Sequence, residues 1–327
     1  MNLSFQMKIL LLSYFTSSVL SFIIVPLLRK LKVKQSERDV GPETHLHKSG
    51  TTTMGGLIII ISTIVLSGFL YFNYSLDQPE IATRLLPMIF VTVGFGIIGF
   101  IDDFKKVILG NTDGISAKAK MVGLSLISIV YILMLLFVFN NGTEIFIPFA
   151  KIYINLPIWI YILFALFVIL GTTNAINLTD GVDGLAGGVS TLIVTALTII
   201  SILWNVKEIT IFGCIIIGSL LGFLMLNLHP AHIFMGDTGS LLVGGAIAGI
   251  ALYMKLPLLL ILLAIIPVIE TISVILQVAY FKKTKKRLFK MAPIHHHFEL
   301  SGWKETAIVI VFCSITIVGC AIGLIAI

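Results

Sequence analysis

Several polar segments of this 327-residue sequence carry side chains suited to chemistry on a phosphate group. Asp102 and Asp103 follow an apolar run and precede a group of lysines, Lys105, Lys106, Lys118 and Lys120. Neighbouring residues of a helix point about 100° apart, so the two carboxylates are not expected to share one ligand position. One of them can face a bound cation or a nucleophile while the other holds a lysine. A solvated helix end is the simpler alternative for this pair.

A second segment combines two carboxylates with glycines. Asp180 and Asp183 follow Asn177 and Leu178, and they lie on one face if the segment is helical. Gly181 and the glycines after it allow the close backbone approach that phosphate and ribose sites need. Ordinary turn and capping chemistry is the alternative interpretation.

A third segment follows Asn227 and contains Asp237. Gly236 and Gly239 lie on either side of Asp237, and the hydroxyl residues Thr238 and Ser240 follow it. Mg²⁺ favours one or two carboxylates together with water and substrate oxygens, so the segment is suited to a magnesium–phosphate site. Phe234 is an apolar side chain in a polar loop, where it could stack on a base or pack against the helix ends.

Three consecutive histidines, His295, His296 and His297, lie in a long basic loop. Adjacent residues of a helix cannot all bind one metal, and the spacing typical of zinc sites is missing. Hydrogen bonding to phosphate oxygens is the better interpretation. No Walker A or GxGxxG motif is present, so the sequence does not indicate an ATPase or a dinucleotide-binding protein. Together the segments predict a phosphate-bearing nucleotide that meets a lipid at the membrane surface.

Membrane-spanning helices must position these segments. The sequence is 57% hydrophobic and only 12% charged, whereas a soluble domain has about 25% charged residues. A backbone in lipid must satisfy its own hydrogen bonds, so long apolar runs become helices. We predict one all-α integral membrane domain over 1–327, with a first helix that is retained rather than cleaved. About ten spans are expected, at 9–28, 55–73, 85–101, 120–139, 157–176, 188–204, 209–228, 238–254, 257–280 and 306–326.

Charge patterning predicts the orientation of these spans. Seventeen of the 22 Lys and Arg residues lie in the connections after odd-numbered spans, together with eleven of 16 acidic residues and all seven histidines. The positive-inside rule places these connections in the cytoplasm and both termini outside. A formal charge of +6 in so charge-poor a chain indicates helix orientation and argues against nucleic-acid binding. Glu270 stands inside the ninth span, so it is expected to face protein or water, and nearby Pro267 is expected to kink that span.

The chain resembles the polyprenyl-phosphate N-acetylhexosamine-1-phosphate transferases in the segments 48–56, 102–103, 177–184, 234–240 and 292–303, in family order. The stretch from His295 to Trp303 is similar to the branch that transfers phospho-MurNAc-pentapeptide rather than GlcNAc-1-phosphate. Thr52 departs from the family pattern, which usually has proline there.

The resemblance implies that UDP-MurNAc-pentapeptide and undecaprenyl phosphate react to give lipid I and UMP in peptidoglycan synthesis. It implies Mg²⁺, a homodimer in the bacterial plasma membrane and a kinked ninth helix. Asp237 would be the Mg²⁺ ligand, and Asp102, Asp103, Asp237 and His295 would be catalytic. Lys48, Asn177, Asp180, Phe234 and Gln277 would line the nucleotide pocket, with Phe234 on uracil. Further residues expected to bind substrate are Thr53, Lys106, Lys118, Leu178, Gly181, Asp183, Asn227, Ala292, His296 and His297.

Two points stay open at this level. An Asp either deprotonates the lipid phosphate for direct displacement or forms an aspartyl-phosphate first; we favour displacement because a phosphate oxygen is already a competent nucleophile. Other functions to weigh are a transporter that uses Glu270 as a proton relay and the GlcNAc-1-phosphate branch of the same family.

Overall fold

The structure, a computed structural model, describes residues 3–31, 51–107 and 114–327. Within these residues ten helices are long and apolar enough to cross a membrane, which confirms the predicted number of spans. They are α1 Leu3–Lys30, α2 Gly56–Asp77, α3 Pro79–Val107, α4 Ala117–Leu133, α5 Ile158–Thr179, α6 Leu185–Leu203, α7 Lys207–Asn227, α8 Gly236–Tyr253, α10 Ile265–Thr284 and α12 Glu305–Ile325. A π-helical turn, η2 Met134–Val138, extends α4. The chain is therefore an all-α, multi-pass membrane protein.

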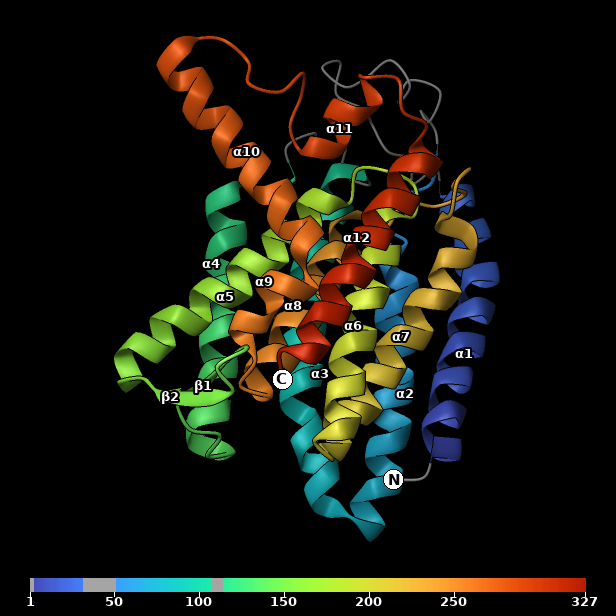
Figure 1. The fold of residues 1–327 in the computed structure, drawn as a ribbon. Helices are drawn as coiled ribbons and strands as arrows, with labels where there is room; N and C mark the ends of the chain where they lie inside the picture. The colour runs from blue at the N-terminus through green and yellow to red at the C-terminus, as the bar shows by residue number, and fades with distance from the viewer. Residues whose placement is uncertain (1–2, 32–50, 108–113) are drawn as a thin grey trace.

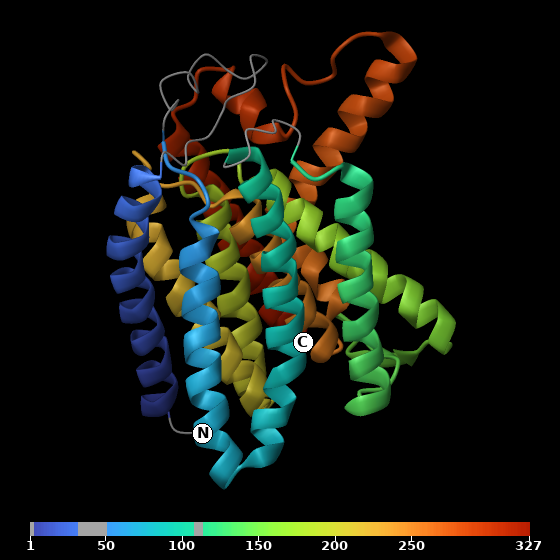
Figure 2. The same cartoon turned by 180° about the vertical axis from the view of Figure 1, so that it is seen from behind.

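Successive spans run in opposite directions, so their connections alternate between the two ends of the bundle (Figure 1). The end where α1, α3, α5, α7 and α10 finish carries the polar segments. The start of α1 and the end of α12 point away from it. Helices α7 and α8 lie in the middle, with 83% and 89% of their apolar windows buried, against 28% for α5 and 22% for α10. Figure 2 shows α4 standing apart from the central helices on one side, with α5 slanting outward beside it.

Small residues let α1 and α7 pack closely. Ser13 and Ser17 of α1 donate hydroxyl hydrogen bonds to backbone carbonyls of α7 at 2.6 and 2.7 Å. A Cβ added to Gly218 or Gly222 of α7 would overlap α1. Lipid tails offer no hydrophobic drive between helices, so such close packing and hydrogen bonding hold the pair together.

The ninth span is broken, as Pro267 predicts. A 3₁₀ turn, η3 Pro257–Leu259, and a short helix, α9 Leu260–Leu263, end at Ala264, and α10 begins at the next residue. Ala264 has φ −101° and ψ 36°, outside the helical region. Proline lacks an amide donor and its ring crowds the carbonyl four residues earlier, so it weakens or kinks the interior of a helix but fits in the first turn. Pro267 lies in that turn of α10.

Two elements are not predicted by the hydropathy pattern. An antiparallel hairpin, β1 Glu144–Ile147 with β2 Ile152–Asn155, pairs Glu144 with Asn155 at the end of the bundle opposite the polar segments. A short helix, α11 Ile294–Glu299, carries the three histidines across the polar end. The all-α prediction holds apart from this small hairpin.

Candidate active site

Close backbone packing sets the position of Asp237. It stands in the first turn of α8, which packs against α2 and α3. A Cβ added to Gly99 of α3 would overlap the carbonyl oxygen of Asp237, and one added to Gly56 of α2 would overlap the amide of Gly239. The first turn of α8 is thus fixed by backbone contacts on two sides.

Asp103 caps the start of α8. Its carboxylate accepts hydrogen bonds from the amide of Asp237 at 3.1 Å, the amide of Thr238 at 2.8 Å and the Thr238 hydroxyl at 2.6 Å. A carboxylate at a helix N-terminus accepts hydrogen bonds from amides that lack partners within the helix. Its negative charge also interacts favourably with the positive end of the helix dipole. Asp103 therefore connects α3 to the turn that presents Asp237.

Asp102 points to different partners, as the angular spacing predicts. Its Oδ2 lies 2.6 Å from Lys106 Nζ and 3.4 Å from Lys120 Nζ. The same two ammonium groups lie 2.9 and 2.7 Å from Asp237 Oδ2. Asp102 Oδ1 accepts the amide of Ile115 at 2.7 Å. Two carboxylates thus share two lysines, and the four charges sum to zero.

Asn177 and Asp180, from the end of α5, complete this cluster. The amide nitrogen of Asn177 donates to Asp237 Oδ1 at 2.7 Å and lies 2.8 Å from the Ser240 hydroxyl. The pKa of Asp180 is raised to about 7, first by burial and then by the charges of Asp237 and Asp103, against a hydrogen bond from the amide of Gly236 that lowers it. A carboxyl beside other carboxylates holds its proton more tightly.

Asp183 and Asn227 contact protein groups. Asp183 Oδ2 lies 3.0 Å from His229 Nδ1 and accepts the amide of Ala231 at 3.1 Å. The Asn227 side chain donates to the carbonyl of Ile233 and accepts the amide of Gly184, at 2.9 and 3.2 Å. Both side chains therefore shape the loop between α7 and α8.

The loop that holds Phe234 pairs with the segment before α2. The Phe234 amide donates to the carbonyl of Thr52 at 2.8 Å, and the Gly55 amide donates to the carbonyl of Phe234 at 2.8 Å. The first bond uses the Thr52 carbonyl, which the proline usual in the family would also supply. Thr53 is buried, and a Cβ added to Gly236 would come within 3.2 Å of its hydroxyl.

The histidines of α11 have separate partners. His295 is 1% exposed, and its Nδ1 lies 3.1 Å from Oε1 of Glu270 in α10. His296 Nδ1 lies 2.7 Å from Glu299, and His297 Nδ1 accepts the amide of Lys290. Glu270 faces protein, as expected of a charge at membrane depth.

Gln277 lies on α10 and holds the basic loop that follows this helix. Its side chain donates to the carbonyl of Phe289 at 3.2 Å and accepts the amides of Leu288 and Phe289. Ala292 and Leu178 are half-buried at the polar end. Their predicted contacts with substrate stay predictions.

The lysines are only partly those predicted. Lys106 lies in the cluster, Lys118 is exposed, and Lys48 lies outside the described residues. Lys120, which was not among the expected substrate-binding residues, contacts Asp237 instead. Positions 118 and 120 point about 200° apart on a helix, so only one of them can face α8. Knowing which face of α4 packs inward would have identified Lys120.

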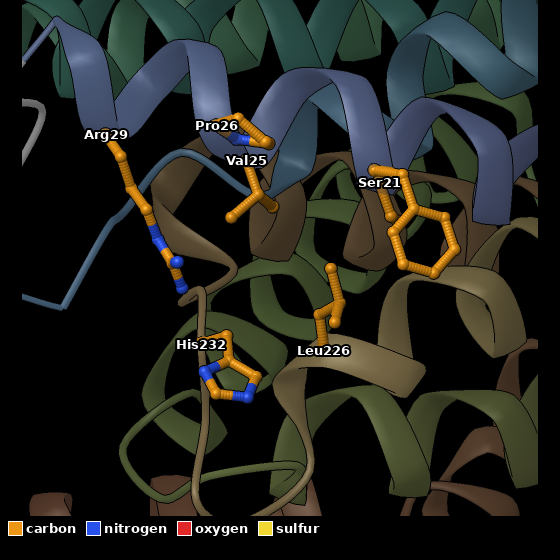
Figure 3. A pocket seen from close by; sticks show the side chains of 7 residues that line it. Ser21, Val25, Pro26, Arg29, Leu226 and His232 are labelled. Carbon is orange, nitrogen blue, oxygen red and sulfur yellow. The ribbon is translucent and has the colours of Figure 1, made fainter.

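Two surface cavities lie at the edges of the polar end. One, of about 190 Å³, opens between α1 and the segment 226–232, and it is bounded by Ser21, Val25, Pro26, Arg29, Leu226 and His232 (Figure 3). It contains none of the residues expected to bind substrate. The other, of about 390 Å³, is lined by His229, Trp303 and Glu305 among others and lies next to the Asp183–His229 pair.

The cluster around Asp237 suits a hard divalent cation. Asp102 and Asp237 both approach Lys106 Nζ within 2.9 Å, so they already share one cation. Carboxylate and amide oxygens are the donors that Mg²⁺ prefers. Two groups of His and carboxylate donors within 4.8 Å occur in the described residues, Asp183–His229–Glu305 and His295–His296–Glu299. In each group a histidine and a carboxylate are hydrogen-bonded to each other.

The fold and this site define a multi-pass membrane protein that gathers carboxylates and lysines at one end of its helix bundle. Comparison with known proteins agrees. The model of a family described as Glycosyl transferase family 4 matches residues 85–255.

Three relatives share the name phospho-N-acetylmuramoyl-pentapeptide-transferase. The one from Acetivibrio thermocellus is 45% identical over 327 residues, covering 99% of this chain and 96% of the relative. That from Clostridium perfringens strain 13 is 48% identical over 315 residues, with 96% of each chain covered. That from Bacillus subtilis strain 168 is 44% identical over 305 residues, covering 93% and 92%. The chain belongs to glycosyl transferase family 4, and within it to the phospho-N-acetylmuramoyl-pentapeptide-transferases.

Proposed function

We propose that this chain transfers phospho-MurNAc-pentapeptide from UDP-MurNAc-pentapeptide to undecaprenyl phosphate, giving lipid I and UMP. The observation that carries the proposal is the Asp102–Lys106–Lys120–Asp237 cluster at the surface of a chain 45% identical, over 99% of its length, to a phospho-N-acetylmuramoyl-pentapeptide-transferase. A site at the membrane surface suits a reaction between a soluble nucleotide and a lipid phosphate.

The reaction brings two anionic substrates together, so their repulsion must be offset. We assign Asp237 as the carboxylate ligand of Mg²⁺. When bound, the ion would neutralise charge on the pyrophosphate.

The chain's own residues bind the substrate phosphates and orient the Asp237 carboxylate. Lys106 and Lys120 lie within reach of any phosphate oxygen at Asp237. Asn177 holds one carboxylate oxygen of Asp237, and Asp103 fixes the turn of α8 that carries it. Asp103 is thus a positioning residue, and Asp102 is the better candidate for a base toward the lipid phosphate.

We assign the polar end of the bundle to the cytoplasm, where the nucleotide substrate is made, and we expect a homodimer.

Product formation in membranes that contain the purified chain tests this function. With labelled UDP-MurNAc-pentapeptide, undecaprenyl phosphate and Mg²⁺, we expect a labelled lipid and free UMP. UDP-GlcNAc in the same membranes should give none. A lipid product from UDP-GlcNAc alone would place the chain in the GlcNAc-1-phosphate branch, and the absence of any product from either nucleotide would contradict the proposal.

A further inference from the structure

Glu270 is a buried carboxylate that the proposed reaction does not yet use. It is 0% exposed within α10, a membrane-spanning helix. A carboxylate removed from water is strongly disfavoured unless a partner compensates for the lost hydration. Its side-chain oxygens face His295 of α11, at 3.1 Å from Nδ1 and 3.5 Å from the backbone amide.

The pairing decides which ring nitrogen of His295 is available. A carboxylate accepts hydrogen bonds and does not donate them, so Nδ1 carries the proton that joins the two side chains. Among the described residues, Nε2 of His295 is buried and has no hydrogen-bond partner. An unpaired buried nitrogen is rare in proteins and calls for an explanation.

The unpaired nitrogen points toward the nucleotide end of the site. A Cβ added to Gly181 would overlap His295 Nε2. Gly181 directly follows Asp180, whose pKa is raised by burial and by the charges of Asp237 and Asp103. The absence of a side chain at position 181 therefore lets the Asp180–Gly181 segment lie directly against Nε2. The neighbouring histidine has its own partner: the His296 ring lies 4.1 Å from the His295 ring, tilted by 59°, and its Nδ1 pairs with Glu299.

We infer that Glu270 is a positioning residue for the transfer reaction, holding His295 so that Nε2 donates a hydrogen bond to a phosphate oxygen of the nucleotide. This inference rests on the proposed function, which supplies the phosphate. A phosphate oxygen accepts hydrogen bonds, so Nε2 must be a donor in the complex, and the Glu270 carboxylate compensates the charge of a ring protonated on both nitrogens. Carboxylates that orient a metal-binding histidine in this way contribute about 10- to 100-fold to metal affinity or activity, and we expect an effect of that order here.

A double-mutant cycle on nucleotide affinity tests the inference. The dissociation constant of UDP-MurNAc-pentapeptide is measured for the full-length chain, Glu270→Gln, His295→Gln and the double variant. We expect Glu270→Gln to weaken binding roughly tenfold. In the His295→Gln background the same change should alter binding less than about twofold, because the residue acts through the ring.

A matched control is Glu208→Gln. Glu208 is another buried carboxylate of a membrane span, hydrogen-bonded to the Tyr253 hydroxyl at the opposite end of the bundle, and its replacement should leave nucleotide affinity unchanged. If Glu270→Gln does not fold, as judged by the loss of a cooperative melting transition, Glu270→Asp takes its place in the cycle. That variant keeps the charge but moves it by one methylene, and binding should weaken severalfold only when His295 is present.

Unchanged affinity in the Glu270 variant, or an equal loss with and without His295, would overturn the inference. Failure of the unmutated chain to bind this nucleotide or to form a lipid product would instead overturn the proposed function.

Discussion

At the scale of single residues, adjacent aspartates have different tasks. Asp102 shares Lys106 and Lys120 with Asp237, whereas Asp103 caps α8. The sequence predicts that the two carboxylates diverge, because the angle between neighbours on a helix is fixed. It does not predict which partner each one meets, since most of those partners lie in other elements, up to 135 positions away. For the same reason the sequence names Lys118 and Lys120 in one lysine group near the aspartates, but it does not show which of them contacts Asp237.

Asp237→Asn should abolish turnover, with a loss of at least about a hundredfold, as for other groups that stabilise charge in a transition state. Nucleotide binding should survive in part, because the lysines do not depend on that carboxylate for their charge. Turnover and nucleotide affinity are measured side by side. Activity within tenfold of the unmutated chain would contradict the assignment of Asp237.

The mechanism can be tested by isotope exchange. If an aspartate formed a covalent phospho-sugar intermediate, labelled UMP would exchange into UDP-MurNAc-pentapeptide without lipid. We expect no exchange in rigorously delipidated protein and its recovery when undecaprenyl phosphate is added, because displacement needs both substrates. Lipid-free exchange at a rate near kcat, or an adduct trapped on Asp102, would rule out direct displacement.

Asp180 predicts how stability depends on pH. Its folded pKa of about 7 exceeds the ordinary value of 3.8, so the folded state binds this proton more tightly than the unfolded chain does. The resulting stability is fully present below about pH 4 and is lost as pH rises through 7. The melting temperature of the unmutated chain should therefore fall, relative to Asp180→Asn, between pH 5 and pH 8 in detergent without divalent cations. Asp77→Asn, an exposed change at the opposite end, is the control, and a difference that does not vary with pH would refute this reading.

At the scale of helices, hydropathy predicts the ten spans because each one must be long and apolar to cross lipid. The hydropathy pattern does not predict the hairpin, because each of its strands has only four residues. Helix α11 escapes the prediction because six residues, three of them histidine, carry no helical hydrophobic period. Pro267 marks the break in the ninth span, but only packing shows that the chain restarts at Ile265.

Helix packing supplies a prediction that changes no polar group. Gly99→Ala places a methyl group against the carbonyl of Asp237, so α8 must shift away from α3. A displacement near 1 Å can lower a rate about a hundredfold, and we expect a loss of that order in turnover. Gly68→Ala, in α2, meets open space and should leave turnover unchanged. Equal activity of the two variants would show that the α3–α8 contact does not set the site.

At the scale of the whole molecule, the polar end and the hairpin end should lie on opposite sides of the bilayer. Single cysteines at Ala119 and Lys286, both exposed at the polar end, and at Lys151 in the hairpin turn test this arrangement. In a background without Cys214, Cys313 and Cys320, an impermeant reagent added to intact cells should label only position 151. Labelling of position 119 or 286 before the cells are opened would contradict a cytoplasmic site.

Helix α8, which carries Asp237, also bears on how the protein is made. It has the lowest mean hydropathy of the ten spans, 1.2, and 89% of its apolar window is covered by other parts of the chain. A segment that meets so little lipid gains little from entering the bilayer by itself. Its insertion during synthesis is therefore driven by docking onto helices made before it, chiefly α3 and α5. Asp237 thus reaches its place only as the nascent bundle closes, so we expect an unfinished chain to lack the cluster around this carboxylate.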